Sequence, residues 1–217
     1  MRTKLAASLS EAMERVGLTD GMTVSFHHHL RNGDRVVNLV LDAIARAGIG
    51  NLTVNASSLF DAHLTLLDHA RAGVVAALET DYVSPLVGSA ISAGVLCSPV
   101  LFRTHGGRAA DLQTGRAHID VAFIAAPSAD PMGNCSGKFG PSACGSLGYA
   151  FADALYADRV VVLTDHLAPY PLNQFSIDET RVDCVVAVDS IGDPAGIVSG
   201  TTRITRDPVG LMIASLA

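Results

Sequence analysis

Apolar residues recur along the chain in short runs, which alternate with longer stretches of helical spacing. Strands are predicted at 21–26, 51–56, 74–79, 98–104, 118–126, 158–165 and 182–190. Helices are predicted at 33–49, 61–73 and 84–94, where apolar side chains return every three or four residues. Because most strands are apolar throughout, they are expected to be buried on both faces. The predicted fold class is α/β, with a largely parallel sheet flanked by helices.

The N-terminal segment is predicted to form an amphipathic helix that ends near Gly17. Its apolar residues at helical spacing are Leu5, Leu9, Ala12, Met13 and Val16. Glu11, Glu14 and Arg15 interrupt the apolar segment that a signal peptide would need. No apolar stretch is long enough to span a bilayer, so no membrane partner is expected. Four cysteines without paired spacing and the lack of a signal peptide predict reduced thiols and a cytoplasmic location.

Composition limits the chain to one substantial core. It has 217 residues, of which 49% are hydrophobic and 17% charged, and neither a repeat nor a low-complexity linker divides it. We therefore predict a single domain over residues 1–217. The net charge of −6 and the absence of a Lys/Arg-rich run argue against nucleic-acid binding.

The stretch "TVSFHHHLRNGD" places three histidines at the end of the first strand of this rhythm. In parallel α/β sheets, ligands bind outside the carboxyl ends of the strands. Adjacent residues of an extended chain point to opposite sides, so at most two of His27, His28 and His29 share a direction. A zinc site would need spacings such as HExxH or paired CxxC, which are absent, and no metal is predicted. A polar strand end exposed to water remains the alternative to a binding loop.

The segment "THGGRA" follows a later strand. Its adjacent glycines, Gly106 and Gly107, let the backbone approach a ligand closely, and their N–H groups are candidates for stabilising an oxyanion. Arg103, His105 and Arg108 supply positive charge or donors that suit a carboxylate. The alternative is an ordinary turn. The sequence contains no dinucleotide fingerprint, no P-loop and no nucleophile elbow.

Two further strand ends carry candidate polar residues. In the long loop 126–140, Asp130 and Asn134 either position a substrate or brace the loop, and bracing is the interpretation that each residue favours on its own. Ser57 and Ser58 end the second strand, where serine is more often a cap than a ligand contact.

Five segments taken together strongly resemble the α chains of bacterial citrate lyases, in the same order and over essentially the whole chain. They are "GMTVSFHHHLRNGD", "RTHGGRA", "HIDVAFIAAPSADPMGN", "GSLGYAFADALYAD" and "VDSIGDPAGIVSGTTRITRDP". The wider relatives are the CoA-transferases, whose acidic-x-x-Gly-Asn loop resembles "ADPMGN". Those relatives have a glycine-rich loop after the first strand, where this chain has three histidines.

The resemblance implies a CoA-transferase-like domain that exchanges acetyl for citrate on a CoA-like thioester. The thioester would be the phosphoribosyl-dephospho-CoA group of an acyl carrier protein, or acetyl-CoA, and no cofactor is expected to be bound by this chain. Implied partners are a β subunit, which cleaves the citryl-carrier protein to oxaloacetate and acetyl-carrier protein, and the γ carrier protein, in bacteria that ferment citrate.

Citrate is a tricarboxylate, and it suits histidines whose pKa lies near neutrality and arginines that pair with carboxylates. The candidate substrate-binding residues are His27, His28, His29, Ser57, Ser58, Arg103, His105, Arg108, Asp130 and Asn134.

One departure from the family is expected to matter. Its members have two CoA-transferase-like halves, and this chain is about as long as the first half. Either it is a fragment, or a separate polypeptide supplies the second half. In related transferases the catalytic glutamate belongs to the second half, so none is assigned here. The alternatives are another carboxylic-acid CoA-transferase, an acyl-CoA hydrolase of the same fold, or an inactive assembly module.

Overall fold

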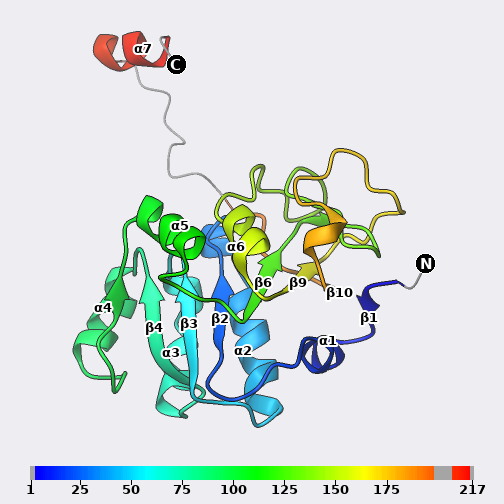
Figure 1. Ribbon diagram of the computed structural model, residues 1–217. Coiled ribbons are helices and arrows are strands. Elements are labelled where there is room, and N and C mark those ends of the chain that lie inside the picture. Colours follow the sequence, from blue (N-terminus) through cyan, green and yellow to red (C-terminus); the bar gives the residue numbers. More distant parts are fainter. Residues whose placement is uncertain (1–2, 198–206, 216–217) are drawn as a thin grey trace.

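The computed structural model describes residues 3–197 and 207–215, and its centre is a parallel β-sheet (Figure 1). Within the described residues the sheet has eight strands in the order β1-β10-β9-β6-β2-β3-β4-β5, and every pairing is parallel. The strands are β1 (Leu5–Ala6), β2 (Thr23–Phe26), β3 (Leu52–Ala56), β4 (Val75–Thr80), β5 (Leu101–Phe102), β6 (Val121–Ala125), β9 (Arg159–Thr164) and β10 (Cys184–Ala187). The predicted α/β class is confirmed.

Helices cover both faces of the sheet. These helices are α1 (Leu9–Val16), α2 (Val36–Arg46), α3 (Leu66–Arg71), α4 (Pro85–Ser92), α5 (His105–Thr114) and α6 (Ala150–Tyr156). Short 3-10 turns lie at Arg31–Gly33, Asp61–His63 and Glu179–Arg181, and the helix α7 (Pro208–Ala214) does not belong to the layers on the sheet. Buried residues of α1 to α4 join one apolar cluster, while α5 and α6 join a second cluster. Alternate residues of β6 divide between them: Phe123 lies in the first cluster and Ile124 in the second. This division explains why the strands are apolar throughout.

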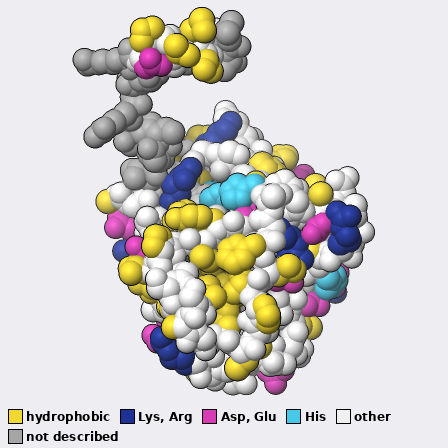
Figure 2. Space-filling view, turned by 90° about the vertical axis from the view of Figure 1, so that its left-hand side faces the viewer, with side chains coloured by type: hydrophobic (Ala, Val, Ile, Leu, Met, Phe, Trp, Pro, Cys, Tyr) yellow, Lys and Arg dark blue, Asp and Glu magenta, His cyan; other side chains and the backbone are white. Residues whose placement is uncertain are grey.

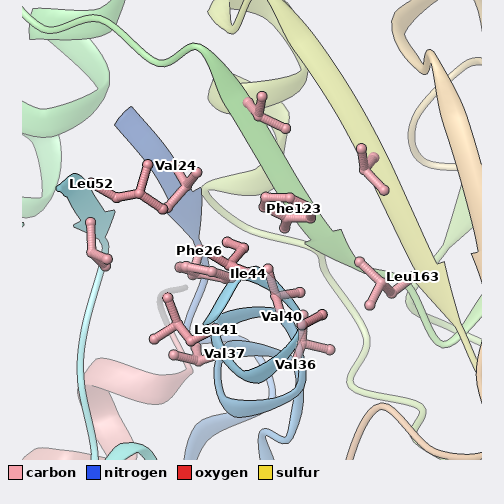
Figure 3. Close-up of a cluster of buried hydrophobic side chains, with 14 of the residues drawn as sticks. Val24, Phe26, Val36, Val37, Val40, Leu41, Ile44, Leu52, Phe123 and Leu163 are labelled. Carbon is pink, nitrogen blue, oxygen red and sulfur yellow. The ribbon is translucent and has the colours of Figure 1, made fainter. Parts of the chain in front are cut away.

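The larger cluster packs α2 against the middle of the sheet (Figure 3). The predicted apolar face of α2 is buried, and its members are Val36, Val37, Val40, Leu41 and Ile44. Beside this face the rings of Phe26 and Phe123 stack with centroids 5.9 Å apart, which ties β2 to β6. Burying each such side chain contributes about 2 kcal/mol, so this packing fixes where β2 ends.

The N-terminal prediction is partly wrong. Leu5 lies in β1, where it pairs with Val185 of β10, and not in a helix. The helix α1 begins after Ser8, whose Oγ accepts a hydrogen bond from the N–H of Glu11. Its end at Gly17 is as predicted, because this glycine takes the left-handed conformation (φ 70°) that terminates helices.

Other elements also differ from the sequence expectations. The predicted strand 98–104 contains only two residues of β-strand, and α5, which was not predicted, starts directly after it. The helix predicted at 61–73 is divided into a 3-10 turn and α3. Part of the fifth resembling segment, residues 198–206, lies outside the described residues.

The edge of the sheet at β5 is apolar and exposed. Figure 2 shows hydrophobic side chains gathered on this side of the molecule, and the exposed large ones here include Tyr82, Leu86, Leu101 and Phe102. Natural proteins keep edge strands short, and β5 has two residues. No helix among the described residues is long and apolar enough to cross a membrane.

The order of the strands creates a switch point beside β2. From β2 the chain adds β3, β4 and β5 on one side, and it then returns to add β6, β9 and β10 on the other. The crossovers therefore leave β2 and β6 in opposite directions. A crevice opens at the carboxyl ends of two such strands, and it is the general ligand site of open α/β sheets.

Candidate functional site

The three histidines after β2 lie at this switch point, and they divide as the alternation rule predicts. The rings of His27 and His29 stack on one side, with centroids 5.9 Å apart. His28 turns to the other side, where its Nδ1 lies 2.7 Å from the Oγ of Ser57. The prediction that at least one ring turns away from the others is confirmed.

His27 and His29 make their contacts inside the protein. The Nε2 of His27 lies 2.9 Å from Oδ2 of Asp153, and both side chains are buried. The Nε2 of His29 lies 2.7 Å from the carbonyl oxygen of Ala125, at the end of β6. These nitrogens are already engaged, which argues against the predicted role of His27 in contacting substrate.

His28 and His29 are neutral at pH 7. Burial, followed by the charges of His105 and Arg31, lowers the pKa of His28 to about 4. Burial lowers the pKa of His29 to about 3. The expectation of a pKa near neutrality is therefore wrong for this pair. They can still act as neutral donors or acceptors.

His28 belongs to a cluster of rings that several strand ends bring together. We call His28, Phe60, Tyr82, His105 and Tyr149 the ring cluster. Its centroid distances are 5.4 Å from His28 to His105, 5.7 Å from His28 to Tyr149 and 5.3 Å from His105 to Tyr149. Phe60 lies 6.4 Å from His28 and 5.7 Å from Tyr82. The members follow β2, β3, β4 and β5 or precede α6, because parallel strands end at one edge.

A hollow of about 310 Å³ adjoins this cluster. Its lining includes His28, His29, Arg31 and Ser146. A second hollow, of about 680 Å³, lies between α2 and residues 187–190 and includes none of the ring cluster. The smaller hollow is the better candidate site because it lies at the switch point and has both histidines and an arginine on its wall.

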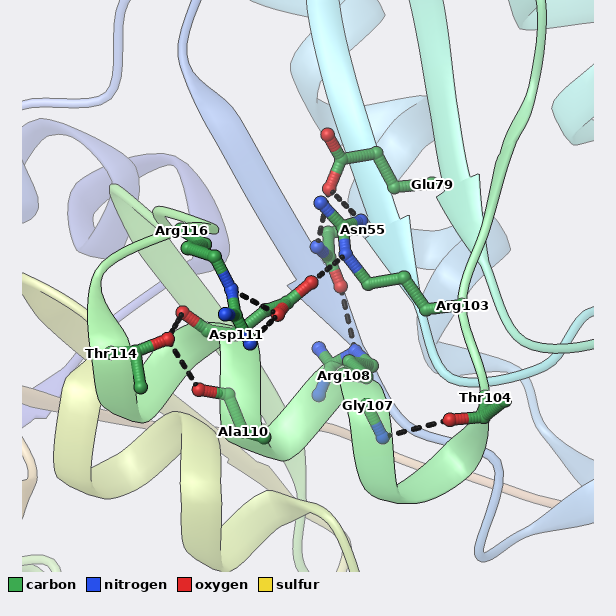
Figure 4. Close-up of polar contacts among 10 residues, drawn as sticks. All are labelled: Asn55, Glu79, Arg103, Thr104, Gly107, Arg108, Ala110, Asp111, Thr114 and Arg116. Atoms are coloured by element: carbon green, nitrogen blue, oxygen red, sulfur yellow. Dashed lines mark hydrogen bonds and ion pairs between the residues drawn. The ribbon is translucent and has the colours of Figure 1, made fainter.

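Arg108 makes its contacts inside the protein, which argues against its predicted role in binding substrate. Its side chain is buried, and its guanidinium makes two bonds of 2.7 and 2.8 Å to the carboxylate of Asp153. Its Nε donates to Asn55 at 2.7 Å (Figure 4). Burial disfavours the charge of Asp153, but His27 and Arg108 more than offset this and hold the pKa of the carboxyl below its usual range. The arginine binds a carboxylate, but one from its own chain.

Arg103 is engaged in a similar way, which argues against its predicted contact with substrate. Its guanidinium lies 2.6 Å from Glu79 and 2.9 Å from Asp111, and Glu79 also accepts from Asn55 (Figure 4). Asp111 is shared with Arg116 as well. We call the connected set His27, Asn55, Glu79, Arg103, Arg108, Asp111 and Asp153 the ion network.

The two glycines of "THGGRA" occupy the first turn of α5 and do not form a free turn. Thr104 caps this helix, and its Oγ1 accepts the N–H of Gly107 at 3.0 Å, which removes that donor from the predicted oxyanion site. A methyl group at Gly106 would meet no atom within 4 Å, so the backbone there faces open space. Of the two predicted donors, Gly106 is the one that remains.

Asp130 and Asn134 brace their loop, which is the interpretation that the sequence favours for each residue on its own. Oδ1 of Asp130 accepts the N–H groups of Met132, Gly133 and Asn134, and its Oδ2 accepts from Asn134 and Leu172. Both side chains are buried. Within this loop β7 (Ser128–Ala129) and β8 (Cys135–Ser136) pair as an antiparallel hairpin.

The two serines differ in what they contact. Ser57 accepts the backbone N–H of His28 at 3.1 Å and contacts its ring, so it orients that side chain. Ser58 donates to the carbonyl oxygen of Ser57 at 2.6 Å, which is a local backbone contact. Both serines are buried.

Sequence reasoning missed Asp81, Tyr149 and Asp153. Asp81 directly follows β4, and its Oδ2 lies 3.2 Å from Nδ1 of His105. Burial raises the pKa of Asp81 to about 6, although Arg108, His105 and Arg103 act in the opposite direction. A polar residue at the end of an apolar strand was an available signal for Asp81. The helix α6 starts at Ala150 after Tyr149, and Ser146 does not cap it.

Sequence similarity relates the chain to a known family. The family model described as "Citrate lyase, alpha subunit (CitF)" matches residues 2–217. The citrate lyase alpha chain of Escherichia coli (strain K12) is 50% identical over 214 residues, which are 99% of this chain and 42% of that protein. That of Klebsiella pneumoniae is 45% identical over 99% of this chain and 42% of its own length. The chain therefore spans 42% of the length of these curated relatives.

Solved structures give the same picture. A Streptococcus mutans protein, described as an alpha subunit of citrate lyase in complex with citrate, is 51% identical with a TM-score of 0.91. The match covers 98% of this chain and 42% of that one. Glutaconate coenzyme A-transferase from Acidaminococcus fermentans shares the fold at 15% identity and a TM-score of 0.66, over 90% of this chain and 77% of its own.

Proposed function

This chain belongs to the family of citrate lyase alpha subunits, and we propose that it acts in the same way, exchanging acetyl for citrate on a CoA-like thioester. The thioester donor in this proposal is the phosphoribosyl-dephospho-CoA group of an acyl carrier protein, or acetyl-CoA. The proposed partners are the β subunit, the γ carrier protein and a second CoA-transferase-like half. The proposed location is the cytoplasm, and residues 1–217 are proposed to form one domain.

The observation that carries the proposal is the position of His28. It stands at the switch point of the sheet, on the wall of the 310 Å³ hollow and in the middle of the ring cluster. The relative that is 51% identical over nearly the whole chain is described in complex with citrate. A hollow whose wall includes two imidazoles and an arginine suits a polyanion, although the chain carries a net charge of −6.

The chemistry needs groups that hold citrate and groups that stabilise an oxyanion. A carboxylate oxygen of citrate attacks the acetyl carbonyl, negative charge develops on the carbonyl oxygen, and the thiolate leaves. The thiolate then attacks the citryl carbonyl and expels acetate. The N–H of Gly106 is the remaining backbone donor for the developing charge, and one well-placed donor lowers the barrier by roughly 3 kcal/mol. His28 and Arg31 are proposed to hold the carboxylates of citrate.

In this proposal the ion network positions the site and does not bind substrate. Arg108 lies on α5 and Asp153 on α6, and the bidentate ion pair between them fixes the two helices against each other. His105 begins α5 and Tyr149 precedes α6. The pair therefore sets the distance between two members of the ring cluster.

The fold alone also fits a different acid as the substrate. The glutaconate transferase shares this fold at low identity, so another carboxylic-acid CoA-transferase or an acyl-CoA hydrolase is the second candidate function. An inactive assembly module is the third. An acid panel separates them: citrate exchange supports the proposal, exchange of another acid supports the second candidate, and free acetate without exchange indicates hydrolysis.

The test measures incorporation of radiolabelled citrate into a CoA thioester, starting from acetyl-CoA. The assay also contains a polypeptide that corresponds to the part of the relatives that this chain does not cover. His28→Ala is expected to slow citrate exchange about tenfold or more, because an aligned donor is lost. The matched control is His118→Ala. The side chain of His118 is 61% exposed and lies just before β6, at the amino ends of the strands and therefore away from the site. Exchange at the unchanged rate in His28→Ala would overturn the assignment.

A further inference from the structure

We propose that Asp81 is a positioning residue that holds the imidazole of His105 so that its Nε2 faces the anionic substrate. This inference rests on the function proposed above. It adds a residue that lies behind the ring cluster and acts through His105.

The pair has one buried end and one open end. The side chain of Asp81 is 1% exposed, whereas that of His105 is 51% exposed. Nδ1 of the ring lies 3.2 Å from Oδ2 of Asp81. The two nitrogens of an imidazole lie on different sides of the ring, so the engagement of Nδ1 leaves Nε2 on the side away from Asp81.

Asp81 has few other partners. Apart from the contact with His105, neither of its oxygens accepts a hydrogen bond from the residues that the structure describes. Arg103 and Arg108 lie close enough to affect its charge, but their guanidinium groups bond to Glu79, Asp111 and Asp153. Burying a carboxylate without hydrogen bonds is costly. The cost is reduced when the imidazole presents an N–H to it, and His105 is the group positioned to do so.

Neighbouring rings restrict the rotation of the His105 ring about its side-chain bonds. The ring of Tyr149 meets it edge-on with an interplanar angle of 82°, and His28 lies on another side with centroids 5.4 Å apart. Unlike these rings, Asp81 carries a charge, and because it lies beside Nδ1 it distinguishes the two ring nitrogens of His105. With the proton on Nδ1, the neutral ring presents a lone pair at Nε2. When a substrate carboxylate binds, the protonated ring donates from Nε2 and Asp81 stabilises the imidazolium.

The site thus has two histidines in different roles. His28 is neutral and meets Ser57, whereas His105 has a carboxylate behind it. The titratable groups that face His105 are Asp81 at the end of β4, His28 at the end of β2 and Tyr149 before α6, while Arg108 and Arg103 act on the charge of Asp81.

The experiment measures the tautomer of His105 directly. Nitrogen-15 NMR of the histidine-labelled 217-residue chain separates a protonated from an unprotonated ring nitrogen, and the spectrum of His105→Gln assigns the signal. Wild type is expected to carry the proton on Nδ1 when the ring is neutral. In Asp81→Asn the amide can donate to Nδ1, so the proton is expected to move to Nε2. Asp68→Asn is the matched control, since this exposed carboxylate pairs with Arg71 on α3.

Citrate affinity provides the second readout. Asp81→Asn is expected to weaken citrate binding about tenfold, and the double variant Asp81→Asn/His105→Gln is expected to bind no more weakly than His105→Gln alone. A thermal unfolding midpoint at or above that of wild type shows that Asp81→Asn is folded. An unchanged His105 spectrum in Asp81→Asn, or additive losses in the double variant, would overturn the inference. If wild type exchanges no citrate, the proposed function fails, and the tautomer still reports on Asp81.

Discussion

The ion network and the ring cluster come from the same strand ends, yet they differ in how far their polar atoms are paired within the chain. In the ion network the guanidinium groups of Arg103 and Arg108 are paired with carboxylates of the same chain. In the ring cluster, Ser57 is the hydrogen-bond partner of the imidazole of His28 among the described residues, and the ring of His105 is half exposed. Arginine beside a strand end therefore signals a carboxylate but does not say whose it is. The half-exposed rings mark the place that is left for a ligand.

The largest effect is expected from breaking the ion network. Arg108→Met leaves the buried carboxylate of Asp153 without its main partner and should cost about 3 to 5 kcal/mol of unfolding free energy. Urea denaturation measures this. Arg108→Met combined with Asp153→Leu should lose less than the sum of the two single variants, because no unpaired charge remains. A loss below about 1 kcal/mol in Arg108→Met would show that the pair is not structural.

Adjacent histidines allow a sharper test of the division between the two regions. His27→Ala removes a buried partner of Asp153 and should cost about 2 kcal/mol of unfolding free energy. His28→Ala should cost under about 1 kcal/mol, because its ring lies in the half-exposed cluster, and its effect should appear in citrate exchange. Equal destabilisation by both variants in urea titrations would remove the distinction between network and cluster.

The smallest effect distinguishes the two carboxyl groups by pH. Asp81 has a folded pKa of about 6, above its unfolded value, so the folded state holds a proton between about pH 4 and 6 that the unfolded chain has released. Its contribution to stability is lost as pH rises through this window. Asp153 has a lowered pKa, so its contribution is present above about pH 4 and is lost in acid.

Asp81→Asn does not titrate at this position. Relative to wild type, its unfolding free energy should therefore rise by about 1 kcal/mol between pH 4 and pH 7, since water still screens part of this loop. Asp153→Asn should show the opposite trend, with its largest deficit at pH 7. Parallel pH profiles for the two variants, from denaturation at matched pH values, would contradict the assignment of opposite shifts.

The sheet could largely be predicted from the sequence, but the start of α5 could not. Strand and helix periods are local, which is why α2 and most strands lie where they are predicted. Gly106 and Gly107 have poor helix propensity, so their segment resembles a turn. The cap at Thr104, which accepts from Gly107, is the local signal that favours a helix there.

The site divides in a similar way between local and distant information. Alternation along an extended chain is a local rule, and it separates His28 from its two neighbours on the sequence alone. The role of Arg108 depends on Asp153, which lies 45 positions further along the chain, and on which face of α5 meets the sheet. Such a pairing is set by tertiary packing, and no spacing rule reveals it.

The pairing of β1 with β10 has a consequence for how the chain is made. Leu5 is synthesised 180 residues before its partner Val185. At the usual pace of translation the first strand waits on the order of ten seconds for its neighbour. The β2–β3–β4 half can pair long before that, so the sheet has to grow outward from the strand that carries the histidines, and its N-terminal edge is the last to close.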